Sequence, residues 1–252
     1  MYHELEIEGR SLCQSNRGYE HYVLKETDFR SQTRLLQESR WRGVCVGEAL
    51  SSYPANSVVF TFDDGCETDL IVAAPILREN DFGATFYVTA GFVGQIGYMT
   101  PSQVRELSAM GFEIGCHSMS HAYLNDLDAS GLKREIVEAK DRLEQTAGTV
   151  VEHFSCPGGR CNRRAVEVVR AAGFRSLATS RVEANTPATD AFALGRIAVR
   201  RTMSLPAFQQ SCRGHGLWKT RFLDSLRVAP KYLLGNQRYD RVRALLLGDE
   251  QP

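Results

Sequence analysis

Two adjacent aspartates, Asp63 and Asp64, directly follow a short apolar run at residues 58–62, and Gly65 comes next. Neighbouring side chains of a strand point to opposite faces, but where a strand gives way to a loop, two carboxylates can be directed into one cleft. Gly65 allows the chain to turn sharply there because it has no Cβ. Such a pair can bind a metal ion and act as a general base, or it can form an acidic turn that caps the following helix.

Further along the chain, His117 and His121 are four residues apart. On one turn of a helix, both imidazoles would face the same way and could share an ion. With one oxygen of Asp64 they form a two-histidine, one-carboxylate set that leaves coordination positions open. Such a set suits Zn²⁺, and non-haem iron sites use similar ligands. A lone histidine is better explained as a core or surface residue, but this combination predicts a metal site.

Short apolar runs alternate with amphipathic segments along the rest of the chain. The runs predict strands at residues 1–7, 44–46, 58–62, 84–89, 112–116, 150–155, 174–179 and 194–199. The amphipathic segments predict helices at residues 27–39, 68–79, 100–110, 130–147, 162–172 and 204–213. This alternation is typical of an α/β protein with a parallel sheet, and both an open doubly wound sheet and a closed (β/α) barrel satisfy it.

In either architecture, functional side chains gather at the carboxyl ends of the strands. Asp63, His117 and the Pro-Gly-Gly turn at residues 157–159 each lie just past the end of a predicted strand. Three separate strands are therefore expected to bring polar groups to the same face of the sheet.

The overall composition excludes several classes of protein. The 252-residue chain is 43% hydrophobic and carries 30 basic and 30 acidic residues, so we expect a substantial core and no nucleic-acid partner. Its 7 cysteines contain no Cys-x-x-Cys pair, which favours reduced thiols in a cytoplasmic protein. The N-terminus shows no apolar signal segment, and the uncharged stretch at residues 82–104 is interrupted by glycines and a proline, which favours strand and loop over a membrane span.

Three cysteines, Cys66, Cys116 and Cys156, adjoin these polar stretches and raise the alternative of a thiolate metal site. The two-histidine, one-carboxylate set is adequate without them, and small buried cysteines are common core residues. We therefore expect the three side chains to pack in the interior.

Three motifs carry a resemblance to a known family. Residues 61–65 (Thr-Phe-Asp-Asp-Gly) and 117–121 (His-Ser-Met-Ser-His) resemble the first two motifs of the polysaccharide deacetylases, the NodB-homology or carbohydrate esterase family 4 domain. Residues 154–159 (Phe-Ser-Cys-Pro-Gly-Gly) resemble the third motif, and the likeness spans about residues 1–210. The resemblance implies a distorted (β/α) barrel and the hydrolysis of N-acetyl, sometimes O-acetyl, groups on sugars.

The resemblance also implies a divalent metal and a division of roles. The ion is most often Zn²⁺, with Co²⁺, Ni²⁺ and Mn²⁺ as alternatives. By position, Asp63 resembles the general base, while Asp64, His117 and His121 resemble the metal ligands. Three residues of the third motif and its flank are expected to contact the substrate: Pro157, Gly158 and Arg160.

The chain departs from the family pattern in two places. The third motif often carries an arginine, thought to orient the base, where Ser155 stands; Arg160 is the substitute that the sequence offers, and its alternative is a solvated residue at a helix start. The late Leu-x-His motif, which supplies the general acid, is missing from residues 194–201.

A histidine at the beginning of the chain offers a replacement for the missing acid. Met1-Tyr2-His3 resembles the N-terminal Tyr-His strand of an exopolysaccharide-processing branch, in which a permuted order puts this histidine first. His3 is therefore the candidate acid, and His215 is a rival that follows a helix rather than a strand.

The C-terminal residues differ in composition from the rest of the chain. We expect one deacetylase domain at residues 1–215 and a basic amphipathic helical tail at residues 216–252. Between residues 217 and 247 the tail alternates basic and apolar residues with few acidic ones. A helical hairpin docked on the barrel explains this pattern, and peripheral attachment to an anionic membrane is the alternative.

The predicted function is a metal-dependent hydrolase that removes N-acetyl groups from an acetylated sugar or polysaccharide. Two alternatives stay open: a deacylase of a small-molecule or lipid-linked amide, and a catalytically silent glycan-binding module. The complete Asp-Asp/His/His set argues against the silent module.

Overall fold

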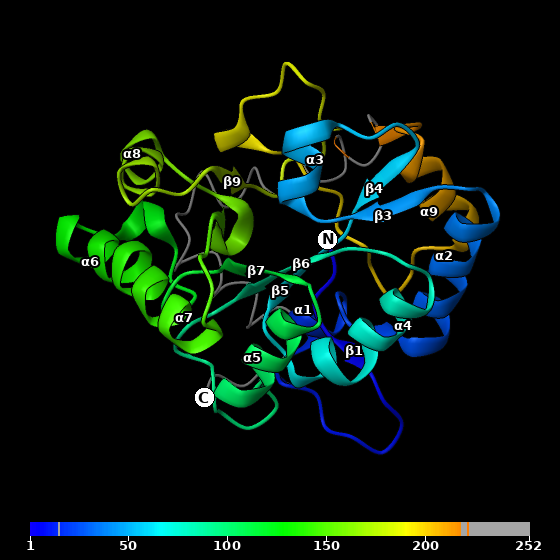
Figure 1. Cartoon of the computed structure of the whole chain (residues 1–252), viewed down its shortest axis with the longest axis horizontal. Helices are drawn as coiled ribbons and strands as arrows, with labels where there is room; N and C mark the ends of the chain where they lie inside the picture. Colours follow the sequence, from blue (N-terminus) through cyan, green and yellow to red (C-terminus); the bar gives the residue numbers. More distant parts are fainter. Residues whose placement is uncertain (15, 218–220, 222–252) are drawn as a thin grey trace.

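The computed structural model describes residues 1–14, 16–217 and 221 and is built around one parallel sheet (Figure 1). Its five strands are β5 (Thr61–Asp64), β6 (Thr85–Val88), β7 (Glu113–Cys116), β8 (His153–Ser155) and β9 (Ser176–Ala178). Each strand pairs in parallel with the next one in the chain, so the sheet advances in a single direction. A doubly wound sheet would reverse direction, and of the two architectures left open by the sequence the barrel type is therefore observed.

Short bridges extend both edges of this sheet and bring them together. Beyond β9, Ala178 forms a parallel bridge with Leu194, and beside β5, Tyr2 forms a parallel bridge with Phe62. The two extensions meet where the Met1 carbonyl accepts a hydrogen bond of 2.9 Å from the Val199 backbone N–H. The first residues of the chain thus lie between the segment after β9 and β5, and they close the curled sheet into a distorted barrel.

Two predicted strands have a different form in the structure. The strand expected at residues 58–62 is divided into β4 (Ser57–Val59), which pairs with β3 (Arg42–Val44), and β5, which pairs with β6. The division falls at Phe60, whose N–H bonds to Val44 while its carbonyl accepts from Thr85. The strand expected at residues 194–199 is reduced to single bridges and backbone hydrogen bonds. A further pair, β1 (Leu5–Glu6) and β2 (Leu24–Lys25), lies near the N-terminus.

The helices lie around the sheet as the sequence predicts. In Figure 1 strands β5, β6 and β7 run through the centre, with α5 and α7 on one side and α2 and α4 on the other. The helix bounds are α1 (Arg17–Glu20), α2 (Glu26–Glu38), α3 (Val46–Ser52), α4 (Ala74–Glu79), α5 (Pro101–Ala109), α6 (Ala129–Lys133), α7 (Ala139–Ala147), α8 (Arg163–Ala171) and α9 (Leu205–Cys212). Two π-helical turns complete the long helical segments, Asp69–Ala73 before α4 and Arg134–Glu138 between α6 and α7.

An aromatic layer fixes β5 against the helices beside it. The Phe62 ring stacks on Phe86 of β6 at 4.7 Å between centroids and meets the Phe29 ring of α2 edge-on at 5.7 Å. Tyr2 stacks on the other side of Phe62 at 5.2 Å. Because Phe62 faces this layer, the alternation of a strand turns the next side chain, that of Asp63, toward the barrel interior.

Most of the predicted tail, residues 216–252, lies outside the described residues, so its helical form stays a prediction. None of the helices in the described ranges combines the length and the apolar character that crossing a membrane requires.

Candidate functional site

Asp63 and Asp64 lie side by side at the end of β5, and both are buried. Asp64 has a φ of +82°, a left-handed conformation that side chains other than glycine seldom adopt. This change breaks the strand alternation, so the two carboxylates reach the same site rather than opposite faces. Strained backbone of this kind is concentrated at functional sites.

The three predicted metal ligands come together at this strand end. The Nε2 atoms of His117 and His121 lie 3.6 and 3.5 Å from Asp64 Oδ1. One ligand atom from each residue fits in a group whose members are all within 4.8 Å of one another. Donor atoms that share an ion with bonds near 2.0–2.1 Å lie roughly 2.9–3.4 Å apart, so the set needs only a small contraction around an ion.

The surroundings of these atoms fit a divalent cation. Asp64 Oδ1 is buried and has no hydrogen-bond partner among the described residues, although such an atom normally has one. His117 Nδ1 lies 2.9 Å from the Ser155 carbonyl, which can only accept, so Nδ1 carries the hydrogen. The Nε2 atom of the same ring therefore carries the lone pair, and this atom lies 3.6 Å from Asp64 Oδ1. Burial lowers the pKa of His117 to about 4, which keeps the ring neutral, as a ligand must be.

The loop that carries His121 differs from the helical turn expected for residues 117–121, so that expectation is wrong. Ser118 and His121 have φ values of +67° and +61°, and the segment after β7 is irregular. Buried Glu135 holds it: one carboxylate oxygen accepts from the N–H groups of Met119 and Ser120 at 3.1 and 2.8 Å. The carboxylate replaces the hydrogen bonds that a helix would have supplied. The site role of Glu135 was not foreseen from the sequence.

A buried arginine from the segment after β9 holds Asp63. Arg196 Nη1 and Nη2 donate to Asp63 Oδ1 and Oδ2 at 2.7 and 2.9 Å, which is a two-bond ion pair. Arg196 Nε in turn donates to the Thr179 carbonyl at 2.9 Å, and this bond fixes the plane of the guanidinium. Asp63 is therefore held in one orientation beside the metal ligands, with its Oδ2 3.9 Å from His117 Nε2.

Arg196 was missed in the sequence, where Arg160 was the offered substitute for the base-orienting arginine. The structure corrects this assignment, because both Asp63 oxygens are bonded to Arg196. Ser155, which stands at the motif position of the usual arginine, accepts from Arg196 Nη2 at 2.8 Å and so joins the same network. The only signal in the sequence was that Arg196 lies in the predicted strand at residues 194–199, where the family's late Leu-x-His motif is missing.

The ion pair sets the charge of Asp63. Burial alone would raise the pKa of this carboxyl, but the Arg196 guanidinium, with a further contribution from His117, holds it below its ordinary value. Asp63 is thus a carboxylate at neutral pH and can accept a proton. The pKa of Arg196 is raised in the same pairing, against the effect of burial.

His3 lies at the same site because the N-terminal segment runs beside β5. The Asp63 N–H donates to the Tyr2 carbonyl at 3.0 Å, so the next residue, His3, stands beside the two aspartates. Burial lowers the pKa of His3, and the charges of Asp64 and Asp63 oppose that shift. His215, the rival acid, is exposed in the turn after α9.

The third motif forms a short turn at the end of β8. Pro157 is buried and Gly158 is exposed, with a φ of +63°. A Cβ at Gly158 would come within 2.5 Å of Tyr123, so the glycine permits a close approach of the two loops. The expected contacts of Pro157, Gly158 and Arg160 with a substrate remain predictions.

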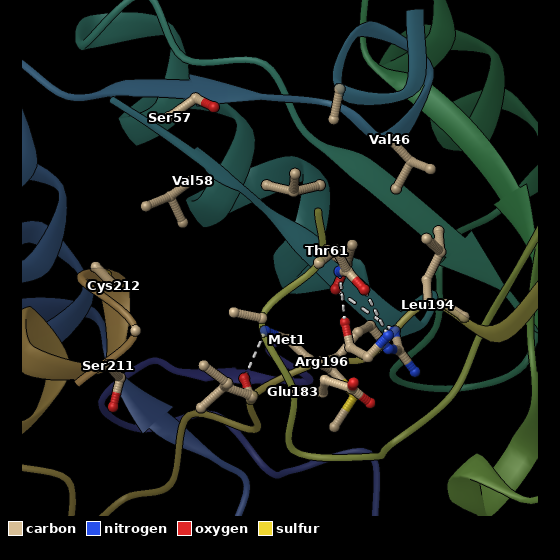
Figure 2. Close-up of a pocket in the computed structure, with 18 of the residues that line it drawn as sticks. Met1, Val46, Ser57, Val58, Thr61, Glu183, Leu194, Arg196, Ser211 and Cys212 are labelled. Carbon is tan, nitrogen blue, oxygen red and sulfur yellow. Dashed lines mark hydrogen bonds between the residues drawn. The ribbon is translucent and has the colours of Figure 1, made fainter. Parts of the chain in front are cut away.

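A separate cavity of about 430 Å³ lies at the beginning of β5, away from the metal ligands. Figure 2 shows its wall, which includes Thr61, Leu194 and Arg196 together with Val46 and Val58. Arg196 therefore contributes to both places, because its head group holds Asp63 and the same side chain forms part of the cavity wall. The cavity lining within the described residues contains none of the three metal ligands.

This chain is similar to known proteins over much of its length. The family model "Polysaccharide deacetylase" matches residues 51–177. A chitin deacetylase of Pestalotiopsis sp is 29% identical over 138 residues, which cover 54% of this chain and 46% of that protein. The poly-beta-1,6-N-acetyl-D-glucosamine N-deacetylase of Staphylococcus aureus (strain MRSA252) is 23% identical over 205 residues, which cover 73% of this chain and 70% of that protein.

The fold is similar to that of a solved deacetylase structure. The Streptococcus pyogenes deacetylase PplD, solved in complex with acetate, superposes with a TM-score of 0.74 at 22% identity, over 84% of this chain and 95% of that one. The chain spans about half the length of the first curated relatives that it matches. The family model covers half of the chain and includes the aspartate pair, both ligand histidines and the third motif, so the chain belongs to the polysaccharide deacetylase family.

Proposed function

We propose that this chain is a metal-dependent hydrolase that removes N-acetyl groups from an acetylated glycan. One observation carries the proposal: an unpartnered Asp64 oxygen and two imidazole nitrogens converge, while the neighbouring Asp63 stays outside the ligand group and is held by Arg196. A carboxylate that is held beside a cation site but does not bind the cation is placed to accept a proton from water.

Asp64, His117 and His121 would hold the ion, and the neutral ring of His117 with its outward Nε2 lone pair suits Zn²⁺. When bound, the ion would supply Lewis acidity, which lowers the pKa of water and attracts the acetyl oxygen. His121 is the most exposed of the three ligands, with 37% of its side chain accessible, and leaves the site open to a substrate.

Two residues of this chain would carry out the two proton transfers of the reaction. Asp63 accepts the proton of the attacking water through a carboxylate oxygen, and Arg196 keeps that carboxylate in position throughout. His3 donates a proton to the sugar nitrogen, which is too basic to leave as an anion. Because burial lowers the pKa of His3, the resting ring is neutral near pH 7 and takes up a proton before it donates one.

The substrate class rests on the relatives. The Staphylococcus aureus relative is named for poly-beta-1,6-N-acetyl-D-glucosamine, and its similarity reaches 73% of this chain. The N-terminal strand with His3 closes the barrel here, which supports the exopolysaccharide branch that the opening Met1-Tyr2-His3 resembles. We therefore favour a β-1,6-linked N-acetylglucosamine polymer over chitin.

Metal analysis of the purified protein, paired with acetate release, tests the proposal. We expect one zinc equivalent lost on removal of Asp64 and acetate release from β-1,6-linked N-acetylglucosamine oligomers that stops when a chelator is added. Asp63→Asn should retain the metal and lose about 10²–10⁴-fold in kcat, whereas Asp64→Asn should lose both. If Asp63→Asn loses the metal as well, the two roles are wrongly divided.

The same assay separates the alternatives. A small-molecule or lipid-linked amide substrate would give acetate or another acid from the monomeric compound and none from the oligomers. A silent glycan-binding module would bind the oligomers without any release of acetate. Either result rejects the polymer deacetylase.

A further inference from the structure

A second group of side chains with potential metal-ligand atoms lies close to the candidate active site in the described part of the chain. Ligand atoms of Glu4, Cys13 and Cys66 all lie within 4.8 Å of one another. Glu4 and Cys66 are buried, and Cys13 is half-buried. The sequence analysis expected Cys66 only to pack in the core and attached no role to Glu4 or Cys13.

The three side chains already converge through other contacts. Both Glu4 oxygens accept from the Cys13 backbone N–H, at 3.0 and 3.2 Å. Tyr19 Oη lies 3.2 Å from Cys66 Sγ, and Cys13 Sγ donates to the Gly97 carbonyl at 2.9 Å. Cys13 is thereby held close to Glu4, which follows His3, and to the segment around Gly97.

An unexplained buried carboxyl adjoins the same group. Asp69 is fully buried, and neither of its oxygens has a hydrogen-bond partner among the described residues. After burial itself, the Cys13 thiol makes the largest contribution to a pKa of Asp69 well above its usual range, ahead of Asp64 and Glu4. Asp69 is placed beside this group by its backbone, because its N–H donates to the Cys66 carbonyl at 3.0 Å. Burying a carboxyl group whose oxygens accept no hydrogen bond reduces the stability of the fold unless another interaction, such as one with a cation, compensates for the lost hydration.

We propose that Glu4, Cys13 and Cys66 form a second cation site, which takes a thiophilic divalent ion of the Zn²⁺ class with Asp69 as the adjoining acid. Two sulfurs and a carboxylate are a typical borderline-soft donor set. Around a tetrahedral zinc ion such donor atoms lie roughly 3.3–3.8 Å apart. The three ligand atoms, now within 4.8 Å of one another, would have to move by about 1 Å through side-chain rotation to reach these distances. The two thiol protons leave to solvent as the ion binds, and no oxidant is needed.

The ion would join two segments that carry catalytic groups. Glu4 follows His3 directly, and Cys66 stands two residues after Asp64. A shared ion fixes the distance between the N-terminal strand and the end of β5 without touching the substrate. The site is thus a positioning device, and it stands independently of the reaction that the first site performs.

Cobalt titration distinguishes this site from the first one. The tag-free full chain is kept reduced, freed of metal and titrated with Co²⁺, because a cobalt–thiolate bond absorbs strongly in the near ultraviolet and carboxylate and imidazole ligands do not. We expect two equivalents to bind, one of them with the thiolate band. In the His117→Ala/His121→Ala variant one equivalent should remain, with the full band.

Cysteine variants assign the band to its residues. Cys13→Ser should lose the band and one equivalent and keep the other; because Cys13 is half-buried, serine is tolerated there, and Cys66→Ser provides the second variant. Cys212→Ser and Cys161→Ser are the matched controls and should titrate like the unaltered chain. The proposal is overturned if the unaltered chain shows no thiolate band, or if Cys13→Ser retains it. Acetate release plays no part in these readouts, so failure of the deacetylase function would leave them unchanged.

Discussion

The Arg196 guanidinium and the Asp63 carboxylate form a buried two-bond ion pair across 133 positions of sequence, with N···O distances of 2.7 and 2.9 Å. Both side chains are almost fully removed from solvent, at 7% and 3% exposure. In a buried pair of this kind each charge compensates the other, and removing one partner leaves a buried charge that lowers the stability of the fold. The pair fixes the orientation of the residue that we assign as the base.

Removing the arginine is expected to damage both stability and turnover. Arg196→Ala leaves the Asp63 charge buried without its partner, which costs about 3–5 kcal/mol in the free energy of unfolding, and the freed base should lose about 100-fold in kcat. Arg196→Lys should recover the charge but not the two parallel bonds, so kcat should stay low. Denaturant unfolding and acetate release measure the two effects. Arg181→Ala, an exposed arginine, serves as the control, and an Arg196→Lys enzyme with unaltered kcat would contradict the positioning role.

His3 is expected to matter most when the leaving group needs a proton. His3→Gln should lower N-acetyl hydrolysis by about 10²–10⁴-fold and affect an aryl acetate ester far less, because a phenolate leaves without assistance. The metal content should not change, since His3 is outside the ligand group. Parallel assays with the two substrates measure this ratio. His215→Gln is the matched control, and the assignment of the acid is wrong if that variant shows the selective loss instead.

Glu135 is expected to support metal binding without being a ligand. Glu135→Gln removes the negative charge and leaves one acceptor oxygen, which cannot accept from both the backbone N–H groups and the Ser120 hydroxyl as the carboxylate does, so the loop that carries His121 should loosen. We expect a 10–100-fold weaker zinc affinity, measured by competition with a chelator, and about 1–3 kcal/mol less stability. Glu138→Gln lies on the exposed face of the same helical segment and should change neither. Unchanged zinc affinity in Glu135→Gln would remove the supporting role.

A partly buried acid, Glu113, gives a pH dependence at the opposite end of the sheet. Burial raises its pKa, but His153, Thr85 and the Gly47 N–H outweigh that effect and hold the pKa of Glu113 below its usual value. A lowered carboxyl pKa contributes stability that is complete above the unfolded value and is lost as pH falls through the folded value. The stability difference between the unaltered chain and Glu113→Gln should therefore be constant near pH 7 and shrink below about pH 4.5. Unfolding curves from pH 7 to pH 3 measure it, with exposed Glu106→Gln as control; a difference that grows toward low pH would contradict the assignment.

The basic tail remains a prediction from sequence. Between residues 217 and 247 its charged side chains are Lys219, Arg221, Asp224, Arg227, Lys231, Arg238, Asp240, Arg241 and Arg243. If this segment attaches the enzyme to an anionic surface, deletion of residues 217–252 should abolish co-sedimentation with vesicles that contain phosphatidylserine and should leave acetate release unchanged. Equal sedimentation of the two forms, or none of either, favours docking of the tail on the barrel.

The sequence by itself determined the residues of the site that depend on local order. Asp63 and Asp64 follow an apolar run, and His117 follows another, so their place at strand ends can be predicted from the alternation of side chains. The parallel α/β class and most helix positions follow from hydrophobic periodicity in the same way. The identities of Asp64, His117 and His121 were enough to name them as candidate metal ligands, and the structure brings their donor atoms together although residues 117–121 are not helical.

Only the tertiary structure decided how these residues are held. Arg196 reaches Asp63 because the segment after β9 returns to the N-terminal strand, and no local pattern encodes a contact across 133 positions. Glu135 replaces a helix by a strained loop at residues 118–121, and a buried carboxylate that binds backbone N–H groups has no sequence signature. Cys13 and Cys66 meet for the same reason. Long-range contacts are selected by the packing of the whole chain, whereas periodicity and turn chemistry report only on neighbours.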